Sequence, residues 1–448
     1  MNSSTVPINK QKPLEAEKID GALWLFVACL LCGVLYSVTG AAVLGLLPSC
    51  AICLYLLVSP PEEGYIFLLG MQFMRAVIVV PVGDSRFGFV LLAYAILAFK
   101  MFLAKEKLYG EYGLLLLLLA VDVAAGALGG ALHIGDSINW VASFLCMLYI
   151  LKSVADKIDF EKLFTFFLLA QWAICLVNIL AEWQIFGRSL VPDMYGVWVD
   201  GYELFSFGKA YLSIAGGNEI ALNNAMAIAL CVMLFPYVKK TATRVFYVLS
   251  VLFLGYCGFM LIARGFYVEL LLFFALYLLS GIKEPQKLIT ALCVIGLVGV
   301  VFYFVASDLV WVVLERVLVR FEGGNTTRED LLAQAGALLL EDPRTFLLGA
   351  GTYYPERFGF TVHNHYIDAF LALGLFGGLL YLGLLGRAVF EVLRTHAKLS
   401  LRALLPLIML VTYKTISGSV RDVGFYYYVA MTLLFAVYWT RRQESEAA

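Results

Sequence analysis

The chain has 448 residues, of which 62% are hydrophobic and only 15% are charged, and its net charge is −1. Soluble domains contain roughly 45–50% apolar and about 25% charged residues, so this composition excludes a cytosolic enzyme, a disordered protein and a nucleic-acid-binding protein. It indicates an all-α polytopic membrane protein, with residues 1–448 forming a single integral membrane domain.

Apolar runs divide the chain into candidate membrane helices, because a bilayer core requires about 20 mostly apolar residues per helix. The predicted spans are 21–39, 41–58, 66–81, 87–104, 114–132, 138–151, 163–181, 214–236, 245–262, 266–281, 288–306, 366–386, 403–417 and 425–440. Three of them (66–81, 138–151 and 403–417) are short, so we expect 12 to 14 transmembrane helices.

The distribution of lysine and arginine predicts the orientation. With the N-terminus inside, the segments on the cytoplasmic side hold 20 of the 32 basic residues. The positive-inside rule therefore places both termini in the cytoplasm. Two long outer loops remain, 182–213 and 307–365. Because ordered loops beyond about 12–15 residues are usually functional, we expect the active site on the outer face.

The basic residues of the predicted outer segments are almost all arginines, nine out of ten, whereas fourteen of the twenty on the inside are lysines. A guanidinium group binds phosphate bidentately and keeps its charge, which favours a phosphate ligand on the outer side. The alternative for most of these arginines is snorkelling to the interface and structural ion pairing. The nine arginines are Arg86, Arg188, Arg264, Arg316, Arg320, Arg328, Arg344, Arg357 and Arg421.

Metal and disulfide chemistry have little support in the sequence. All nine cysteines fall inside apolar runs, and Cys29-x-x-Cys32 and Cys50-x-x-Cys53 lack polar neighbours that would orient metal ligands. We therefore expect no metal and no other cofactor.

The two outer loops differ in pattern. The first carries interleaved aromatic residues, among them Trp198, which could stack on sugars or lie at the headgroup level. The second contains Thr326-x-x-Glu329, a capping-box pattern followed by apolar residues at helical spacing as far as Asp342-Pro343. We expect a helix there that lies on the membrane surface and roofs a cavity.

His363-Asn364-His365 lies where the second loop re-enters the membrane and contains two of the four histidines. A histidine at such a boundary is often only a structural hydrogen-bonding group. Histidine is also the side chain best matched to accepting a proton near neutral pH, so at least one of the two is predicted to have a functional role. Gly374 and Gly377 follow and give the next helix a face that another helix or a lipid chain can approach closely.

These motifs resemble the bacterial O-antigen ligase and O-antigen polymerase superfamily of lipid-linked polysaccharide transferases. The resemblance rests on His363-Asn364 followed by Gly374 and Gly377, on Ile262-Ala263-Arg264-Gly265, and on the segment from Arg328 to Gly349-Ala350-Gly351. It covers residues 250–385 in detail and the rest of the chain only in architecture.

The resemblance implies a metal-independent glycosyltransferase in the bacterial cytoplasmic membrane. Such proteins transfer a glycan from undecaprenyl diphosphate to the hydroxyl of a glycan or lipid-linked acceptor. His363 is then the first candidate for the base and His365 the second, with Asn364 as a supporting residue. Arg264, assisted by Arg188 or Arg328, is expected to stabilise the departing diphosphate. Glu269 follows Arg264 closely in the sequence, so it could orient Arg264 or belong to a structural polar network between helices.

Three alternatives remain open at this stage. Polymerases and ligases share fold and donor, so the sequence does not separate them. A polysaccharide flippase has a similar size, although transporters usually show related halves, which are not visible here. A peptidoglycan-type polymerase is similar in architecture but typically uses an acidic base, which the histidine motif argues against.

Overall fold

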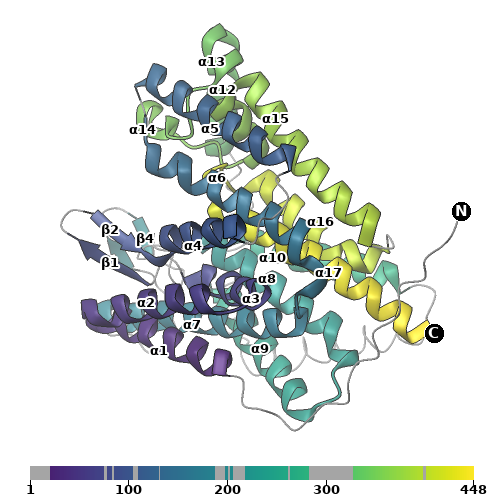
Figure 1. Cartoon of the computed structure of the whole chain (residues 1–448). Coiled ribbons are helices and arrows are strands. Elements are labelled where there is room, and N and C mark those ends of the chain that lie inside the picture. The colour runs from purple at the N-terminus through teal and green to yellow at the C-terminus, as the bar shows by residue number, and fades with distance from the viewer. Residues whose placement is uncertain are drawn as a thin grey trace, which may run out of the picture.

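The computed structural model describes residues 21–74, 78–82, 85–103, 109–130, 132–186, 197–199, 202–204, 217–260, 263–281, 326–396 and 400–447 (Figure 1). Within these residues, eight helices are long and apolar enough to cross a membrane. The chain is therefore a multi-pass membrane protein whose spans are α-helices, as its composition predicted.

Helices occupy most of the predicted spans in the described chain. They are α1 (Gly21–Thr39), α2 (Ala42–Val58), α4 (Phe89–Leu103), α5 (Gly110–Gly129), α6 (Ile134–Tyr149), α7 (Phe160–Phe186), α8 (Gly217–Leu234), α9 (Thr241–Met260), α10 (Arg264–Ser280), α15 (His365–His396), α16 (Leu401–Ile416) and α17 (Val423–Ala447). Three short helical turns follow some of them, the π-helical η2 (Ile150–Val154) and the 3₁₀ turns η3 (Ala155–Lys157) and η4 (Phe235–Tyr237). The predicted span 288–306 lies outside the described residues.

The predicted span 66–81 is wrong at its C-terminal end. Helix α3 (Pro61–Met71) and the 3₁₀ turn η1 (Gln72–Met74) end early, and β1 (Val79–Val82) pairs antiparallel with β2 (Ser85–Gly88). The physical reason is the run of β-branched residues before Gly83-Asp84, since β-branched residues favour strands and Gly-Asp favours a two-residue hairpin turn.

The long predicted loops contain further elements. In the first, β3 (Val197–Val199) pairs antiparallel with β4 (Tyr202–Leu204). In the second, a helix is present where one was predicted, as α12 (Thr326–Glu341), and the short helices α13 (Pro343–Leu348) and α14 (Tyr354–Phe358) follow it. The Asp342 carboxylate accepts hydrogen bonds from the Arg344 amide (3.1 Å) and the Thr345 hydroxyl (2.6 Å), which caps α13 and lowers the pKa of Asp342.

The centre of the bundle is formed by the helices with the least exposed surface. In the most apolar 18-residue stretch of each helix, 94% of the residues are buried in α17, 78% in α8 and 72% in α7. The same fraction is only 28% in α1 and in α9. Exposed leucines such as Leu252 of α9 therefore lie on the faces that a lipid bilayer would cover. In Figure 1, α17 runs through the middle of the molecule.

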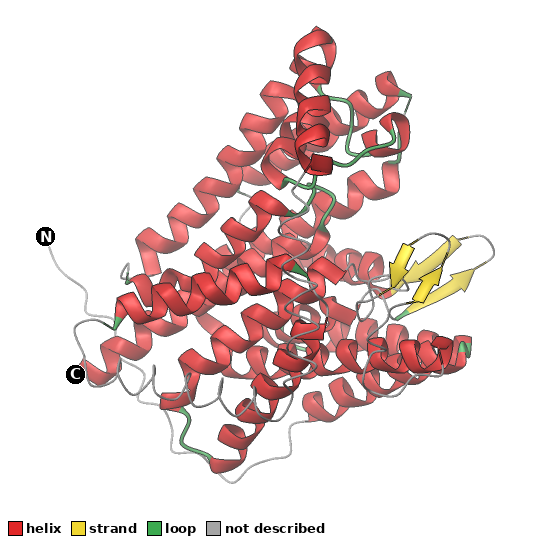
Figure 2. Cartoon of the chain, turned by 180° about the vertical axis from the view of Figure 1, so that it is seen from behind, coloured by secondary structure: helices red, strands yellow, loops and turns green. Residues whose placement is uncertain are grey.

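The helices run between two ends with different side chains. We call the end that contains residues 342–364 the histidine end, and the other, where Lys152 and Lys162 lie, the lysine end. At the lysine end, Lys152 bridges Glu111 (3.1 Å) and Glu391 (2.8 Å). The two β-hairpins and the C-terminal end of α17 lie at opposite sides of the molecule in both Figure 1 and Figure 2.

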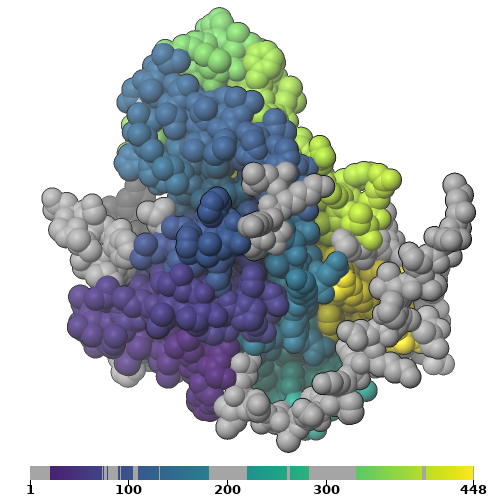
Figure 3. Space-filling view, viewed as in Figure 1, coloured from purple at the N-terminus to yellow at the C-terminus, as the bar shows by residue number. Residues whose placement is uncertain are grey.

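The second loop interlocks with a break in α15. Gly374 departs from helical geometry with φ 70° and ψ −176°, and Gly349 adopts φ 82° and ψ 175° opposite it. The break leaves the α15 carbonyls of Leu371 and Ala372 open to the loop. They accept hydrogen bonds from the amides of Ala350 and Gly351, the two residues after Gly349, both at 2.9 Å. A Cβ at Gly374 would lie 2.4 Å from the Leu347 carbonyl oxygen, so only glycine fits this crossing. Figure 3 shows the segments of α5, α6 and α12–α15 massed at the top of the molecule.

The predicted glycine face of α15 is therefore approached mainly by the protein itself. A Cβ at Gly377 would lie 3.2 Å from Val121 of α5, whereas nothing lies within 4 Å of one at Gly383. Gly377 allows a helix contact, as predicted, and Gly374 allows a loop contact that the helical spacing did not indicate.

Asp122 attaches the same loop to α5 and α6. Its carboxylate accepts hydrogen bonds from the Thr352 amide (2.7 Å), the Thr352 hydroxyl (2.9 Å) and the Trp140 indole (2.9 Å). A buried carboxylate requires such donors, and here they come from the loop and a neighbouring helix. The loop that precedes the histidine motif is thus held on two sides, by α15 and by Asp122.

Candidate functional site

Asn364 begins α15 and joins it to α16. Its Oδ1 accepts hydrogen bonds from the amides of Tyr366 (3.1 Å) and Ile367 (3.0 Å), which is the geometry of a helix N-cap. Its Nδ2 donates to the Thr415 carbonyl at 2.8 Å. The asparagine of the motif thus fixes where the helix starts and which turn of α16 it contacts.

His365 lies inside the protein core. Its side chain is 0% exposed, its Nε2 is 2.7 Å from the Tyr381 hydroxyl, and its ring centroid is 4.1 Å from that of Phe425. Lys414 also lies close, because both His365 and Lys414 are near Gly418. In this position the imidazole is surrounded by side chains of α15, α16 and α17.

His363 is exposed and holds an unusual backbone conformation. Its φ of 53° makes it the one non-glycine residue with positive φ in the described part of the chain. Such a conformation costs about 1–3 kcal/mol and persists only where the surrounding structure imposes it. Here the amide of Val362 donates to the Tyr354 hydroxyl (3.4 Å) on one side, and the Asn364 cap fixes the chain on the other. The two histidines, predicted as alternatives, therefore occupy opposite environments.

The Asp368 carboxylate connects three segments of the histidine end. One oxygen accepts from the Tyr354 hydroxyl (2.6 Å), and the other from the Ser419 hydroxyl (2.8 Å) and the Val420 amide (2.7 Å). Burial and the Asp368 carboxylate raise the pKa of Tyr354 far above its usual 10, so its hydroxyl stays a donor. Asp368 thus holds the loop before His363 and the turn between α16 and α17.

Arg264 is the first residue of α10 and is half-buried. The following Gly265 packs directly on the Tyr413 ring, since a Cβ there would lie 2.6 Å from it. Tyr413 and Thr415 are neighbours in the last turns of α16, so the starts of α10 and α15 both contact the same end of α16. The structure brings the Arg264 and His363 motifs to one end of the bundle although 98 residues separate them in sequence.

Glu269 does not orient Arg264 through a hydrogen bond. Its side chain is 0% exposed, and within the described chain neither of its carboxylate oxygens has a hydrogen-bond partner. Arg188 lies outside the described residues. Arg328 belongs to α12, but its side chain is outside the described part, so the structure does not test these two predicted diphosphate contacts.

Two features of the histidine end were not among the predicted site residues. Lys414 forms a buried ion pair with Asp422, and Arg421 stands beside them in the turn between α16 and α17. The costly placement of Lys414 and Asp368 in predicted spans was a signal for this region. Arg421 had no such signal, because a short turn has no periodicity from which to read a neighbour.

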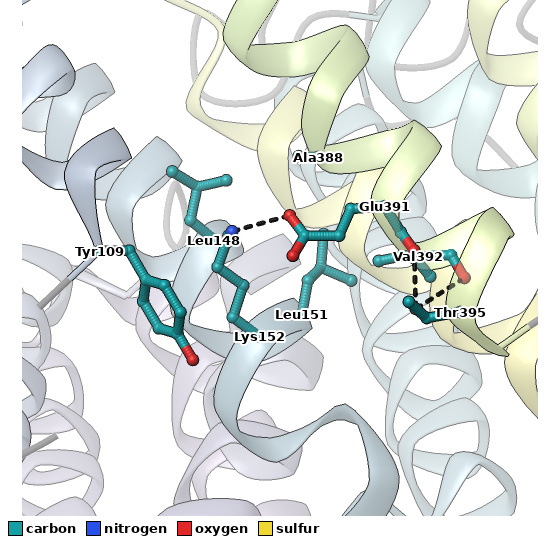
Figure 4. Close-up of a pocket in the computed structure, with 8 residues that line it drawn as sticks. All are labelled: Tyr109, Leu148, Leu151, Lys152, Ala388, Glu391, Val392 and Thr395. Atoms are coloured by element: carbon teal, nitrogen blue, oxygen red, sulfur yellow. Dashed lines mark hydrogen bonds and ion pairs between the residues drawn. The ribbon is translucent and has the colours of Figure 1, made fainter. Parts of the chain in front are cut away.

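An apolar cavity of about 410 Å³ lies beside α12. Its lining comes from α12, α13 and the first turns of α15, namely Leu332, Gly336, Leu339, Phe346, Ile367, Phe370 and Leu375. A smaller cavity of about 110 Å³ lies at the lysine end beside Lys152 and Glu391 (Figure 4). The apolar cavity is next to the histidine motif, whereas the smaller one is at the other end of α15.

No protein-family model matches this sequence, and no curated protein or solved structure matches it significantly. In the described part of the chain, no three of the residue types His, Cys, Asp and Glu are grouped as they would be around a metal ion.

Proposed function

We propose that this protein is a membrane glycosyltransferase that moves a glycan from undecaprenyl diphosphate to an acceptor hydroxyl, without a metal, at the outer face of the bacterial cytoplasmic membrane. The observation that carries the proposal is the exposed His363, held in a strained backbone conformation at the end of the bundle where Arg264 begins α10. Strain of this kind concentrates at functional sites. The resemblance of both motifs to the O-antigen ligase and polymerase superfamily supports the same reading.

His363 is the proposed base. The acceptor hydroxyl attacks the anomeric carbon, its proton passes to the His363 imidazole, and the bond from that carbon to the diphosphate oxygen breaks. The electron pair of that bond leaves with the diphosphate, whose negative charge Arg264 stabilises. A single displacement of this kind inverts the configuration at the anomeric carbon.

His365 is better suited to positioning than to proton transfer with a substrate, because its ring is 0% exposed and its Nε2 faces Tyr381. Asn364 supports the site by capping α15, and Gly374 supports it by admitting the loop that leads to His363. These roles are indirect, since each acts through the backbone next to the base.

The lipid portion of the donor has a chemically suitable neighbour in the cavity of about 410 Å³ beside α12. An isoprenoid chain is entirely apolar, and so are the side chains that line this cavity. The positive-inside rule assigns the lysine end to the cytoplasm. The proposed orientation therefore places the histidine end at the outer face of the membrane.

The test uses the purified full-length protein in lipid nanodiscs with an undecaprenyl-diphosphate-linked repeat unit. A ladder of lipid-linked oligomers would identify a polymerase, whereas product formed only after a separate acceptor is added would identify a ligase. His363→Ala should abolish either reaction, and His396→Ala, at the last residue of α15, should not. A donor that is never consumed would refute the transferase and favour the alternative, a polysaccharide flippase.

A further inference from the structure

Arg421 lies at the histidine end, and its guanidinium group contacts an aromatic ring. Its guanidinium carbon lies 5.5 Å from the centre of the Tyr353 ring. Within the described residues it forms no ion pair or hydrogen bond with a carboxylate, so its five N–H donors remain available. A half-buried arginine in this condition is suited to a ligand that supplies the negative charge.

The acidic side chains around Arg421 are already engaged. Asp422 pairs with Lys414, and the Asp368 oxygens accept hydrogen bonds from Tyr354, Ser419 and Val420. Arg421 therefore interacts with the Asp368 carboxylate only through space, and within the described chain no carboxylate is bonded to its guanidinium group. An oxyanion could bind Arg421 without displacing any of these contacts.

The turn that carries Arg421 is held rigidly. Ser419 and Val420 are both bonded to Asp368, and the Arg421 amide donates to the Ser419 hydroxyl at 3.3 Å. The Tyr353 ring under the guanidinium is itself stacked on His133, with ring centroids 4.3 Å apart and an angle of 12°. A guanidinium fixed in this way loses little conformational entropy when it binds a ligand.

Asp368 places Arg421 and His363 in one framework. Through Val420 it holds the turn before Arg421, and through Tyr354 it holds the amide of Val362, the residue before His363. The base and the arginine are thus anchored to two oxygens of the same carboxylate.

We propose that Arg421 is a binding residue for the diphosphate of the lipid-linked donor, acting with Arg264, and that Asp368 is the residue that positions it. This inference rests on the proposed transferase function. A guanidinium matches the geometry of two phosphate oxygens, and two arginines near the same end of α16 would share the charge that develops as the diphosphate leaves.

The experiment measures the binding of inorganic pyrophosphate and of farnesyl diphosphate to the full-length protein in nanodiscs, alongside glycan transfer. Arg421→Gln should weaken both ligands roughly 10- to 100-fold, because hydrogen bonds to a charged group are lost. Arg421→Lys should have an intermediate effect, since it keeps the charge but not the fork. Arg357→Gln is the matched control, because Arg357 is an exposed arginine of α14 that lies over Phe358.

The outcomes separate the inference from the function on which it rests. If the wild type transfers glycan and both Arg421 variants bind pyrophosphate normally, the role of Arg421 is refuted and the transferase stands. If the wild type neither binds pyrophosphate nor consumes donor, both proposals fail. Glucuronate is added as a probe for sugar carboxylates. If its binding depends on Arg421 and the binding of pyrophosphate does not, the diphosphate assignment is overturned. If Arg421→Gln does not fold, the binding of pyrophosphate to Arg421→Lys decides: weakened binding supports the role of Arg421, and normal binding refutes it.

Discussion

Replacing Gly374 by alanine tests whether the interlock between the second loop and α15 positions the histidine motif. The new Cβ would lie 2.4 Å from the Leu347 carbonyl oxygen and 2.5 Å from the Gly349 amide nitrogen. Both contacts are with backbone, which cannot rotate away as a side chain could. We expect the break in α15 to close into a regular helix and the loop to leave its position.

The cost can be estimated from the structure. A non-glycine residue at φ 70° and ψ −176° costs about 1–3 kcal/mol. The hydrogen bonds from Ala350 and Gly351 to α15 are lost on release in the wild type and in the variant alike, so they do not add to this difference. The docked loop should therefore lose about 1–3 kcal/mol relative to the released one.

The assay is hydrogen exchange at the amides of Ala350 and Gly351, measured by mass spectrometry in nanodiscs. A loss of about 2 kcal/mol should speed exchange roughly 30-fold if local opening limits it. Gly383→Ala is the control, because nothing lies within 4 Å of a Cβ at that position of the same helix. Unchanged protection of the two amides in Gly374→Ala would refute the proposed interlock.

Three further substitutions test the site and its support. His363→Ala should reduce glycan transfer at least roughly 100-fold while the melting temperature stays near that of the wild type, since the side chain is exposed; retained transfer would exclude His363 as the base. Arg264→Lys should lower kcat/KM roughly tenfold or more because a single ammonium replaces the bidentate fork, and near-normal turnover would mean that charge alone suffices. Lys414→Met should destabilise the fold by about 1.5–3 kcal/mol, seen as a lower melting temperature, because it removes the buried ammonium group that pairs with the half-buried Asp422. Adding Asp422→Leu should recover part of that loss, and no recovery would contradict a pairwise role.

The motif His363-Asn364-His365 illustrates how far sequence reasoning extends. Its place at the start of a membrane helix was predictable, because the apolar run begins directly after it. Its division into an exposed residue, a helix cap and a buried residue was not. That division depends on the left-handed backbone of His363 and on packing against Phe425, which is 60 residues away in the sequence.

The contact between the glycines of the second loop and Gly374 of α15 could not be predicted from the sequence either. Gly374 and the pair Gly349 and Gly351 belong to separate sequence motifs, and only the spacing of Gly374 and Gly377 predicts helix packing or a lipid contact. Their meeting depends on a loop crossing a helix backbone, and no periodicity encodes such a crossing. Likewise, the hydropathy of the run before Pro81 predicts a membrane helix as readily as a strand, although its β-branched residues favour the strand that the structure shows.

The sequence by itself determined that this protein is a polytopic helical membrane protein, and it indicated most helix positions, because hydropathy and span length are local properties set by the bilayer. Only the tertiary structure decided which polar residues meet. The convergence of Arg264, His363 and Arg421 at one end of α16, and the three-way anchoring by Asp368, depend on contacts between segments far apart in the chain. Such contacts follow from packing and hydrogen-bond satisfaction across the bundle, which no local pattern specifies.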